Sequence, residues 1–433
     1  MKATSRDEGL VRKVGPCGLA ASVIGIVIGA GIFTVPASLA AAVGPYAPLA
    51  FLACGLIIGA VAICFAEGGS RIPTSGGTYG YVAVAFGPLA GYVAGALLVV
   101  GDVLACGGVT AALADVCAGV APKALGSTVH TVVIVAVIGS VTLINISGVA
   151  RAARFVSVTT ALKLIPLGIF MVVGCIEIGH TPIAPAVQPV TEGAGRALIL
   201  ALFAFIGMES PLTASGEVAQ PSRNIPLALG IAMTSVTLIY IAIQVIAQRI
   251  LGPGLAHSSA PLADAMALVS PWLRTVMLAG AAVSMLGWIS SDILGSPRML
   301  FAFARDGLLF RPLGRVHPRT RVPHVAIAVY AAVALLLALT GTFAELAVLA
   351  AMGTAALYAA GCAAAWVLAR RGVATAGIPL NFRGLGVAMA VGVAGMVALI
   401  ASASWQEIVG LLALMGLSAL GFLLQTRKAL AGR

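Results

Sequence analysis

Charged residues are scarce in this sequence, because Asp, Glu, Lys and Arg make up only 9% of its 433 residues. A soluble globular protein carries roughly 25% of them. Hydrophobic residues instead account for 60% of the chain, and its mean hydropathy is +1.09. We therefore expect an all-α integral membrane protein that lies mostly in a lipid bilayer and has no soluble domain of ordinary size.

Long apolar runs divide the chain into twelve expected transmembrane helices. A spanning helix needs about 20 apolar residues, so twelve of them use most of the sequence and leave short loops. We treat residues 1–433 as a single transmembrane domain. The spans are expected at 15–42, 46–67, 86–119, 130–149, 153–176, 196–217, 225–250, 274–302, 324–341, 344–369, 385–403 and 406–426.

Sequence patterns for metal, disulfide, nucleotide or catalytic chemistry are missing. None of the seven cysteines belongs to a CxxC pair, and all fall in or beside apolar runs, as small core residues do. The glycine-rich stretches lack the Lys-Ser or Lys-Thr of a phosphate-binding loop. No nucleophile–base pair or metal-ligand spacing appears. We expect no cofactor, no metal and no enzyme activity.

Positive charge is unevenly distributed along the chain. The net charge of +11 by itself would suggest nucleic-acid binding, but 20 of the 25 basic residues fall in alternate loops and at the chain ends. This asymmetry is the positive-inside signal of a multi-pass protein with both termini in the cytoplasm. We expect the cytoplasmic membrane and no nucleic-acid partner. The 20 residues are Lys2, Arg6, Arg12, Lys13, Arg71, Arg151, Arg154, Arg223, Arg298, Arg305, Arg311, Arg315, Arg319, Arg321, Arg370, Arg371, Arg383, Arg427, Lys428 and Arg433.

The first span contains a costly interruption. Gly25, Gly29 and Gly31 lie within seven residues, and each glycine costs a helix about 1 kcal/mol relative to alanine. The freed backbone groups also lack water in a bilayer, so such a break is tolerated where it lines a cavity enclosed by protein. Taken alone, Gly25 and Gly29 also fit a GxxxG helix-packing face.

A second interruption, from Phe203 to Pro211, falls in the sixth span. It places a glycine, an acid, a serine and a proline within the five residues that begin at Gly207. Spans 1 and 6 start an odd number of spans apart, so they cross the membrane in opposite directions. Two interrupted helices at matching positions of two five-helix halves indicate an inverted-repeat transporter. The match favours a binding site over a packing face.

The helix ends at these breaks predict the chemistry of the ligand. A break near Gly29 and Gly31 gives the second half of the first span a free N-terminus at mid-membrane, whose N–H groups favour a carboxylate. A break near Gly207 leaves carbonyl groups in the same cavity, and these favour an ammonium group. An α-amino acid carries both charges a short distance apart, so we expect it as the small-molecule substrate.

Spans 1 to 8 also contain a set of short motifs. They are GAGIF at 29–33 with Pro36; PTSGGTYGY at 73–81, FGP at 86–88 and GY at 91–92; FIGME at 205–209 with Glu217 and PSRNIP at 221–226; and GSPR at 295–298 with ARDGL at 304–308. In this order and spacing they resemble the amino acid–polyamine–organocation superfamily of permeases. Spans 9 to 12 match that family in number and hydrophobicity.

The resemblance implies a leucine-transporter-like fold, with inverted repeats of five helices at about 15–176 and 196–369 and peripheral helices at about 385–426. It also implies that substrate backbone groups bind at the two breaks, beside an aromatic gate at Phe203 or Phe205. Many relatives carry serine where Ala30 stands, so backbone amides would supply the donors here. The implied binding residues are Val27, Gly29, Ala30, Gly31, Phe203, Ala204, Phe205 and Gly207.

Two ionisable residues inside the spans are candidates for coupling, because charge within a bilayer is rare and usually functional. Lys163 lies near the middle of the fifth span, where many sodium-independent or proton-dependent relatives carry a lysine in the place of sodium. It holds that position as a fixed cation, or it also exchanges a proton. Glu209 is an acid that the family usually has, and it takes part in proton coupling or fixes the unwound backbone.

Two further residues, Asp102 and Trp288, are candidates to surround the side chain of the substrate. Asp102, in the third span, stands near a polar Asn of the resembling arginine and polyamine exchangers. It pairs with a cationic substrate or bonds to a neighbouring helix. Trp288 lines the cavity or packs in the core. Asp292 lies four residues later, on the same helical face, and lines the inward pathway or pairs with a basic residue.

Charged residues also mark the cytoplasmic ends of two spans. Glu67 and Arg71 are spaced for an i,i+4 ion pair at the end of the second span. Arg305 and Asp306 belong to the end of the eighth span. Such pairs can act as an inner gate, but we expect them on a solvated face.

We interpret the sequence as a secondary permease for amino acids that is proton-coupled or an exchanger. An antiporter for basic amino acids or polyamines is the alternative that rests on Asp102. An amino-acid sensor that does not transport is an alternative from another class.

Overall fold

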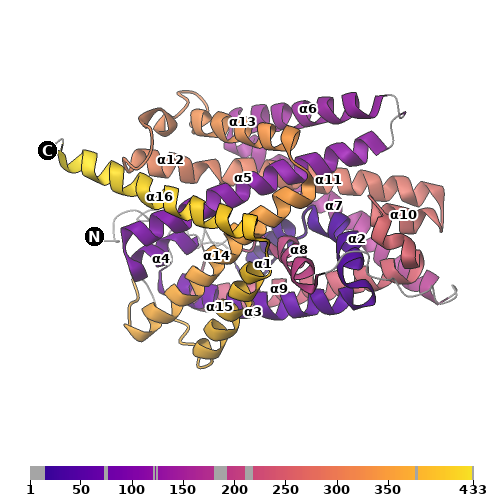
Figure 1. Ribbon diagram of the computed structural model, residues 1–433, viewed down its shortest axis with the longest axis horizontal. Helices are drawn as coiled ribbons and strands as arrows, with labels where there is room; N and C mark the ends of the chain where they lie inside the picture. The colour runs from indigo at the N-terminus through magenta and orange to yellow at the C-terminus, as the bar shows by residue number, and fades with distance from the viewer. Residues whose placement is uncertain are drawn as a thin grey trace.

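The computed structural model describes residues 15–72, 77–119, 122, 125–179, 193–209, 218–375 and 379–431. Most of its long helices run along the long axis of the molecule, and the short helices α1, α2 and α8 lie in the middle among them (Figure 1). The helices are α1 (Pro16–Val27), α2 (Gly31–Val43), α3 (Ala47–Arg71), α4 (Gly77–Phe86), α5 (Pro88–Gly119), α6 (Gly126–Ile146), α7 (Val149–Ile178), α8 (Ala194–Phe205), α9 (Pro221–Leu251), α10 (Pro261–Ala267), α11 (Pro271–Gly295), α12 (Pro297–Arg305), α13 (His324–Thr340), α14 (Phe343–Arg370), α15 (Leu385–Ala401) and α16 (Trp405–Ala431).

Apolar helices dominate the part of the chain that the structure describes. Eight stretches are long and apolar enough to cross a membrane, and shorter apolar helices, among them α1 and α8, accompany them. Large apolar side chains on α6, α7 and α16 are exposed, including Leu143, Val172 and Leu417. Soluble proteins rarely expose large apolar surfaces. These side chains therefore face the lipid around a multi-pass membrane protein.

Glycine and proline set helix boundaries that the hydrophobic pattern does not predict. Gly87 has a φ of 97°, which favours glycine, and together with Pro88 it separates α4 from α5. Pro297 begins α12, so the expected span at 274–302 is divided between α11 and α12. Proline is favoured in a first helical turn because the N–H that it lacks would have no helical partner there.

Small residues allow close approach between neighbouring helices. α3 packs along α9, α5 along α14 and α11 along α7, while α1 contacts α9 and α2 contacts α8. A Cβ atom on Gly55 of α3 would lie 2.5 Å from the side chain of Thr237 on α9, so this contact requires glycine. Close packing of small residues is a common basis of helix association in membranes. The packing encloses the short helices α1, α2 and α8.

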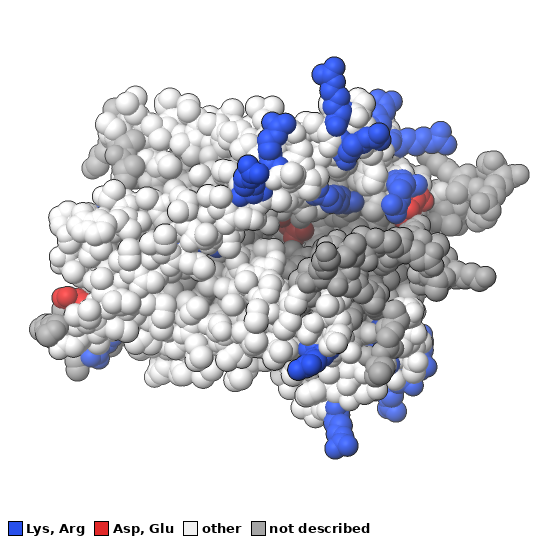
Figure 2. Space-filling view, turned by 180° about the vertical axis from the view of Figure 1, so that it is seen from behind, with Lys and Arg blue, Asp and Glu red and all other residues white. Residues whose placement is uncertain are grey.

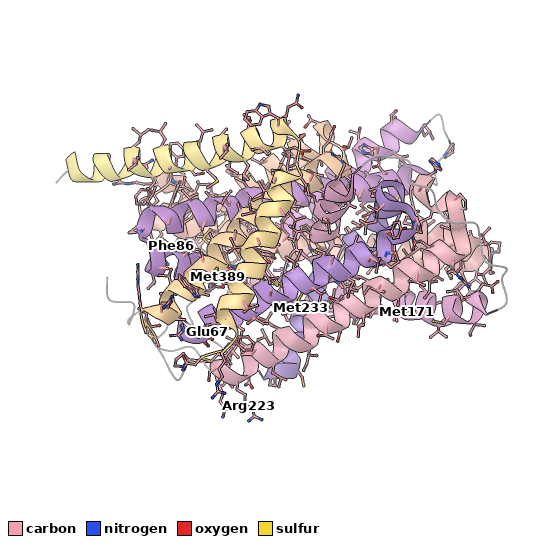
Figure 3. All side chains as sticks on the ribbon, turned by 60° about the horizontal axis from the view of Figure 1, so that its bottom comes forward. Glu67, Phe86, Met171, Arg223, Met233 and Met389 are labelled. Atoms are coloured by element: carbon pink, nitrogen blue, oxygen red, sulfur yellow. The ribbon has the colours of Figure 1, made fainter. Side chains whose placement is uncertain are left out.

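Basic side chains gather at one end of the molecule (Figure 2). Figure 3 places Arg223 and Glu67 toward this end and Met171 of α7 toward the other. The distribution is the one expected for helix ends on a single side of a membrane. The basic residues at the starts of α7 and α9 and at the ends of α12 and α14 are Arg151, Arg154, Arg223, Arg305, Arg370 and Arg371.

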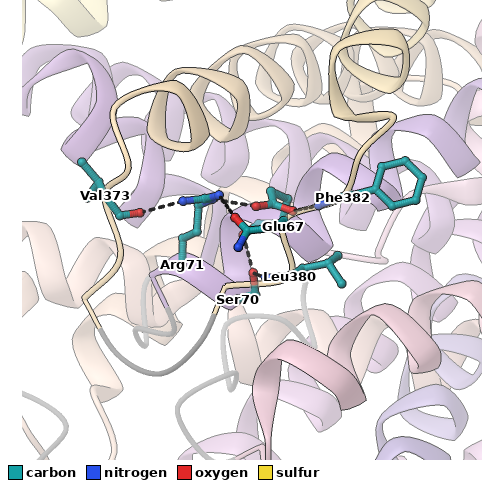
Figure 4. A network of polar contacts seen from close by, with 7 residues as sticks. Glu67, Ser70, Arg71, Val373, Leu380 and Phe382 are labelled. Atoms are coloured by element: carbon teal, nitrogen blue, oxygen red, sulfur yellow. Dashed lines mark hydrogen bonds and ion pairs between the residues drawn. The ribbon is translucent and has the colours of Figure 1, made fainter.

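The ion pair at the end of α3 is buried. Arg71 Nε donates to Glu67 Oε1 at 2.7 Å, and the two residues are 3% and 0% exposed. The expectation of a solvated face is wrong here, because the segment between α14 and α15 covers the pair (Figure 4). Arg71 donates to the carbonyl oxygen of Val373 at 3.2 Å and to Asn381 Oδ1 at 2.7 Å, and the N–H of Phe382 donates to Glu67 Oε2 at 3.0 Å.

Candidate functional site

The first interruption lies between α1 and α2, where the sequence predicts it. α1 ends at Val27, α2 begins at Gly31, and the three residues between them are not helical. Ile28 has a ψ of 77°, and the N–H of Gly29 donates to the carbonyl oxygen of Val27 at 2.7 Å. Because Ala30 is only 2% exposed, α2 starts inside the protein and not at its surface.

The start of α2 presents unpaired amide groups. Within the described residues, the N–H groups of Ala30, Gly31 and Ile32 have no hydrogen-bond acceptor. The first N–H groups of a helix lack partners in the helix itself. Together with the helix dipole, such groups favour a negatively charged group of a ligand. The geometry is therefore suited to a carboxylate.

Close contacts explain two of the glycines in this segment. A Cβ atom on Gly31 would lie 2.8 Å from Cα of Ala204 in α8, and one on Gly29 would lie 2.6 Å from the ring of Trp288 in α11. Either distance is too short for a real contact, and at Gly31 the obstacle is backbone. The glycines therefore allow α8 and Trp288 to approach the break.

The second interruption begins where α8 ends, at Phe205. Ile206 is extended, and Gly207 has a φ of 112°, a conformation that other residues rarely adopt. A Cβ atom on Gly207 would also lie 2.7 Å from the side chain of Ile26, so this end of α8 packs against α1. The rest of the expected sixth span, at 210–217, lies outside the described residues.

A narrow pocket lies between the two interruptions. Two of its lining residues, Val109 of α5 and Ile206, are not predicted from the sequence. Ile206 adjoins the predicted break, which is a signal for it, whereas no local pattern marks Val109. The predicted binding residues that line the pocket are Val27, Gly29, Ala30, Gly31, Phe203 and Trp288.

Of the two candidates for an aromatic gate, Phe203 lines the pocket and Phe205 does not. Phe203 meets the ring of Phe343 edge-on, with 5.4 Å between the ring centroids. Phe205 is fully buried and packs its ring against Phe51 at 6.3 Å. The geometry therefore favours Phe203 as the aromatic residue that a ligand would meet.

Tyr240 of α9 joins the ends of α1 and α8. Its hydroxyl lies 2.8 Å from the carbonyl oxygen of Val27 and 2.9 Å from that of Ala204. The tyrosine is fully buried. Ala204 and Gly207, both predicted binding residues, do not line the pocket and belong instead to the frame around it. No motif in the sequence marks Tyr240.

Lys163 reaches from α7 to the first interruption. The carbonyl oxygen of Gly25 would accept from the N–H of Gly29 in a continuous helix, but that N–H turns to Val27. The ammonium group of Lys163 donates to the Gly25 oxygen instead, and the lysine is 2% exposed. Ser284 of α11 donates to the carbonyl oxygen of Gly29 at 3.0 Å. Side chains of α7 and α11 thus bond the carbonyl groups that the break frees.

Glu209 holds the backbone that follows α8. Its Oε2 accepts hydrogen bonds from the N–H of Gly207 at 3.2 Å and from the hydroxyl of Tyr358 in α14 at 2.5 Å. The glutamate is 3% exposed. These bonds support the alternative in which it fixes the unwound backbone. Its part in proton coupling stays a prediction.

Asp102 does not line the pocket. Its Oδ2 lies 2.6 Å from the hydroxyl oxygen of Ser296, within hydrogen-bond distance, and the same hydroxyl lies 3.1 Å from Asp292 Oδ1. Tyr330 of α13 donates to Asp292 Oδ2 at 2.6 Å. The structure thus brings together two aspartates that the sequence does not connect. Asp292 has hydroxyl partners in place of the expected basic residue.

Comparisons with known proteins point to a permease. A family model for amino acid permeases matches residues 15–419. An uncharacterised transporter of Mycobacterium tuberculosis is 35% identical over 73% of this chain and 71% of its own. The methylthioribose transporter of Bacillus subtilis is 27% identical over 75% of this chain and 74% of its own. The branched-chain amino acid permease of Bacillus subtilis is 25% identical over 98% and 95%.

Proposed function

Because this chain belongs to the amino acid permease family, within the amino acid–polyamine–organocation superfamily, we propose that its substrates are α-amino acids. The names of the family and of the relatives identify a membrane transporter and not an enzyme. The substrate and the mode of coupling are proposals that rest on the geometry of this chain.

The observation that carries the proposal is the pocket between the two interruptions. On one side, the unpaired N–H groups from Ala30 to Ile32 suit a carboxylate. On the other side, α8 ends at Phe205, and the last carbonyl groups of a helix, which lack helical partners, suit an ammonium group. Apolar walls from Val109, Phe203 and Trp288 would enclose an uncharged side chain. A relative named for branched-chain amino acids supports the same type of substrate.

For the membrane topology we propose twelve crossings in one transmembrane domain. In this arrangement α1 and α2 share the first crossing, and α8 begins the sixth. The inverted repeats then occupy about 15–176 and 196–369, with α15 and α16 peripheral. The end at which the basic residues gather would face the cytoplasm. Both termini would lie on that side of the cytoplasmic membrane.

For coupling we propose a sodium-independent mechanism, driven by protons or by exchange. Its support is Lys163, whose ammonium group already bonds the carbonyl oxygen of Gly25. A cation held by the protein at this carbonyl leaves no need for a sodium ion there. Glu209, next to the second break, is the acid that we assign to proton coupling.

Uptake into proteoliposomes tests the proposal. The purified protein is reconstituted, and a panel of radiolabelled amino acids is offered with and without a pH gradient and with sodium replaced by choline. We expect uptake of neutral amino acids that persists without sodium. Uptake that collapses on sodium removal would contradict the role of Lys163. Binding without uptake would identify a sensor instead.

Two other substrates belong in the same panel. Methylthioribose is included because one relative is named as its transporter. Arginine represents the antiporter for basic amino acids or polyamines, which rests on Asp102. In that case Asp102→Asn would abolish uptake of arginine and spare uptake of a neutral amino acid.

A further inference from the structure

Asp102 and Asp292 meet on a single hydroxyl group, and both aspartates are partly buried. Ser296 Oγ lies 2.6 Å from Asp102 Oδ2 and 3.1 Å from Asp292 Oδ1. The aspartates come from α5 and α11, and Ser296 lies between α11 and α12. The second oxygen of Asp292 accepts from Tyr330 of α13. Several helices must therefore pack together to form this arrangement.

The pair lies on the helix faces that lead to the pocket. Val109, which lines the pocket, is seven residues after Asp102 on α5, and Trp288 is four residues before Asp292 on α11. Residues with these spacings share one face of a helix. The aspartates are thus displaced from the pocket by about 10 Å along α5 and about 6 Å along α11. Both displacements run toward the basic end of the molecule.

No cation among the described residues neutralises the two carboxyl groups. Neither Asp102 nor Asp292 has an ion-pair partner there. The titratable groups that face the pair are Cys106 on α5, Tyr330 on α13 and, farther away, the acid Glu209. None of these groups supplies positive charge. Two ionised carboxylates in a bilayer without a counter-ion would carry a large free-energy cost.

The hydrogen-bond donors around the two aspartates are too few for two ionised carboxylates, and a shared proton avoids the free-energy cost. A serine hydroxyl has one proton and can accept from other donors, so Ser296 cannot donate to both aspartates at once. Asp292 also accepts from Tyr330. Asp102 has Ser296 as its hydrogen-bond partner. With a proton on Asp102, its acid O–H donates to Ser296, whose hydroxyl donates to Asp292, and each group is satisfied.

We propose that Asp102 and Asp292 hold one proton between them through Ser296, with Asp102 as the neutral partner. Two carboxyl groups that share one site commonly retain a single proton in this way. The pair then carries one negative charge, which the hydroxyls of Ser296 and Tyr330 stabilise by hydrogen bonds.

The protonation of Asp102 affects which substrate side chains the pocket accepts, an inference that rests on the proposed function. If Asp102 is neutral and bonded to Ser296, it does not present a charge to the pocket. A cationic side chain then gains no counter-ion there, whereas an uncharged side chain loses nothing. Because the remaining charge on Asp292 is bonded by Ser296 and Tyr330, the pair offers arginine or a polyamine no counter-ion in the pocket.

Infrared spectroscopy of the full-length purified protein tests the shared proton directly. At neutral pH we expect the carbonyl stretch of a protonated carboxylic acid, and we expect it to disappear in both Asp102→Asn and Asp292→Asn. The second variant frees the Ser296 hydroxyl to donate to Asp102, which stabilises the ionised form of Asp102. Ser296→Ala should shift the band, because the acid loses its acceptor. Size-exclusion profiles verify that each variant is folded.

Ser290→Ala is the matched control, because Ser290 lies on the same helix as Asp292 and its hydroxyl has no hydrogen-bond partner within the described residues. It should leave the band unchanged. The proposal is overturned if the wild-type protein has no acid band, or if neither aspartate variant removes any part of the wild-type band.

Uptake provides a separate arm of the test. In proteoliposomes, uptake of radiolabelled arginine should stay at background in both the wild-type protein and Asp102→Asn. Arginine uptake that Asp102→Asn abolishes would overturn the proposal, because it would make Asp102 a charged receptor. If the wild-type protein carries no amino acid at all, the proposed function fails, while the infrared band still decides whether the proton is shared.

Discussion

The hydroxyl of Tyr240 lies 2.8 Å from the carbonyl oxygen of Val27, the residue at which α1 ends. The same hydroxyl lies 2.9 Å from the carbonyl oxygen of Ala204, next to the end of α8. Since a tyrosine hydroxyl has one proton, it donates to one of these carbonyls at a time. A change that moves α1 relative to α8 can therefore transfer the bond from one to the other. α9 becomes a common anchor for both sides of the pocket.

Replacing Tyr240 by Phe should weaken this anchor. The variant leaves a buried carbonyl without a donor, which costs about 1–3 kcal/mol. We expect a lower unfolding temperature in detergent and slower initial uptake of leucine in proteoliposomes. Tyr46→Phe is the control, because Tyr46 is 65% exposed. If both variants behave alike, the bond from Tyr240 does not organise the pocket.

Replacing Gly31 by Ala should disturb the contact between the two interruptions. The new methyl group would lie 2.8 Å from Cα of Ala204, and that backbone atom cannot rotate away. Overpacking of this type costs about 1–3 kcal/mol, which corresponds to roughly a 5- to 150-fold change in an equilibrium constant. We expect a loss of uptake within that range, measured as kcat/KM.

The control for this change is Gly139→Ala on α6, because a Cβ atom there meets nothing within 4 Å. Its uptake should equal that of the wild-type protein. A Gly31→Ala variant with normal uptake would show that α2 and α8 need not approach closely for transport.

Replacing Lys163 by Met should slow uptake, because it disturbs the first interruption. The variant removes the donor to the carbonyl oxygen of Gly25, which the break leaves without its helical partner. We expect leucine uptake to fall by roughly 5- to 150-fold, since an unsatisfied buried carbonyl costs about 1–3 kcal/mol. Leu164→Met, on the exposed side of the same helix, should have little effect. Uptake by Lys163→Met that equals the wild-type rate would remove the lysine from the mechanism.

The sequence predicts the two interruptions because their cause is local. Gly29 and Gly31 in an apolar run, and Gly207 beside Glu209, carry a cost that is visible without any tertiary structure. The helix ends and their unpaired amide groups follow from that cost. For this reason much of the pocket lining at the breaks can be named in advance.

Other parts of the site depend on which helices pack together, and no local pattern shows this. Val109 and Tyr240 are ordinary apolar or aromatic helix residues until α5 and α9 lie against the breaks. Asp102 and Asp292 are far apart in the chain, and only the packing of α5 against α11 brings both to Ser296. The i,i+4 spacing predicts the ion pair between Glu67 and Arg71, but its burial depends on a segment about 300 residues later.

The buried ion pair leads to a prediction about stability. Removing one partner leaves the other charge buried without compensation, and in soluble proteins this costs about 3–5 kcal/mol. Glu67→Gln and Arg71→Met should each lower the free energy of unfolding in detergent by a comparable amount. The losses include the bonds that hold Val373 and Phe382. The control is Arg274→Met, because its pair with Asp264 spans 3.5 Å and is partly exposed, and exposed pairs contribute about 0–1 kcal/mol.

A double-mutant cycle separates the ion pair from these other bonds. In the variant with both changes no uncompensated charge is left, so its loss should be smaller than the sum of the two single losses. An additive result would mean that Glu67 and Arg71 act independently, each through its own bonds to the segment between α14 and α15. Because that segment joins α15 to the rest of the chain, the cycle also measures how firmly the pair attaches the last two helices to α3.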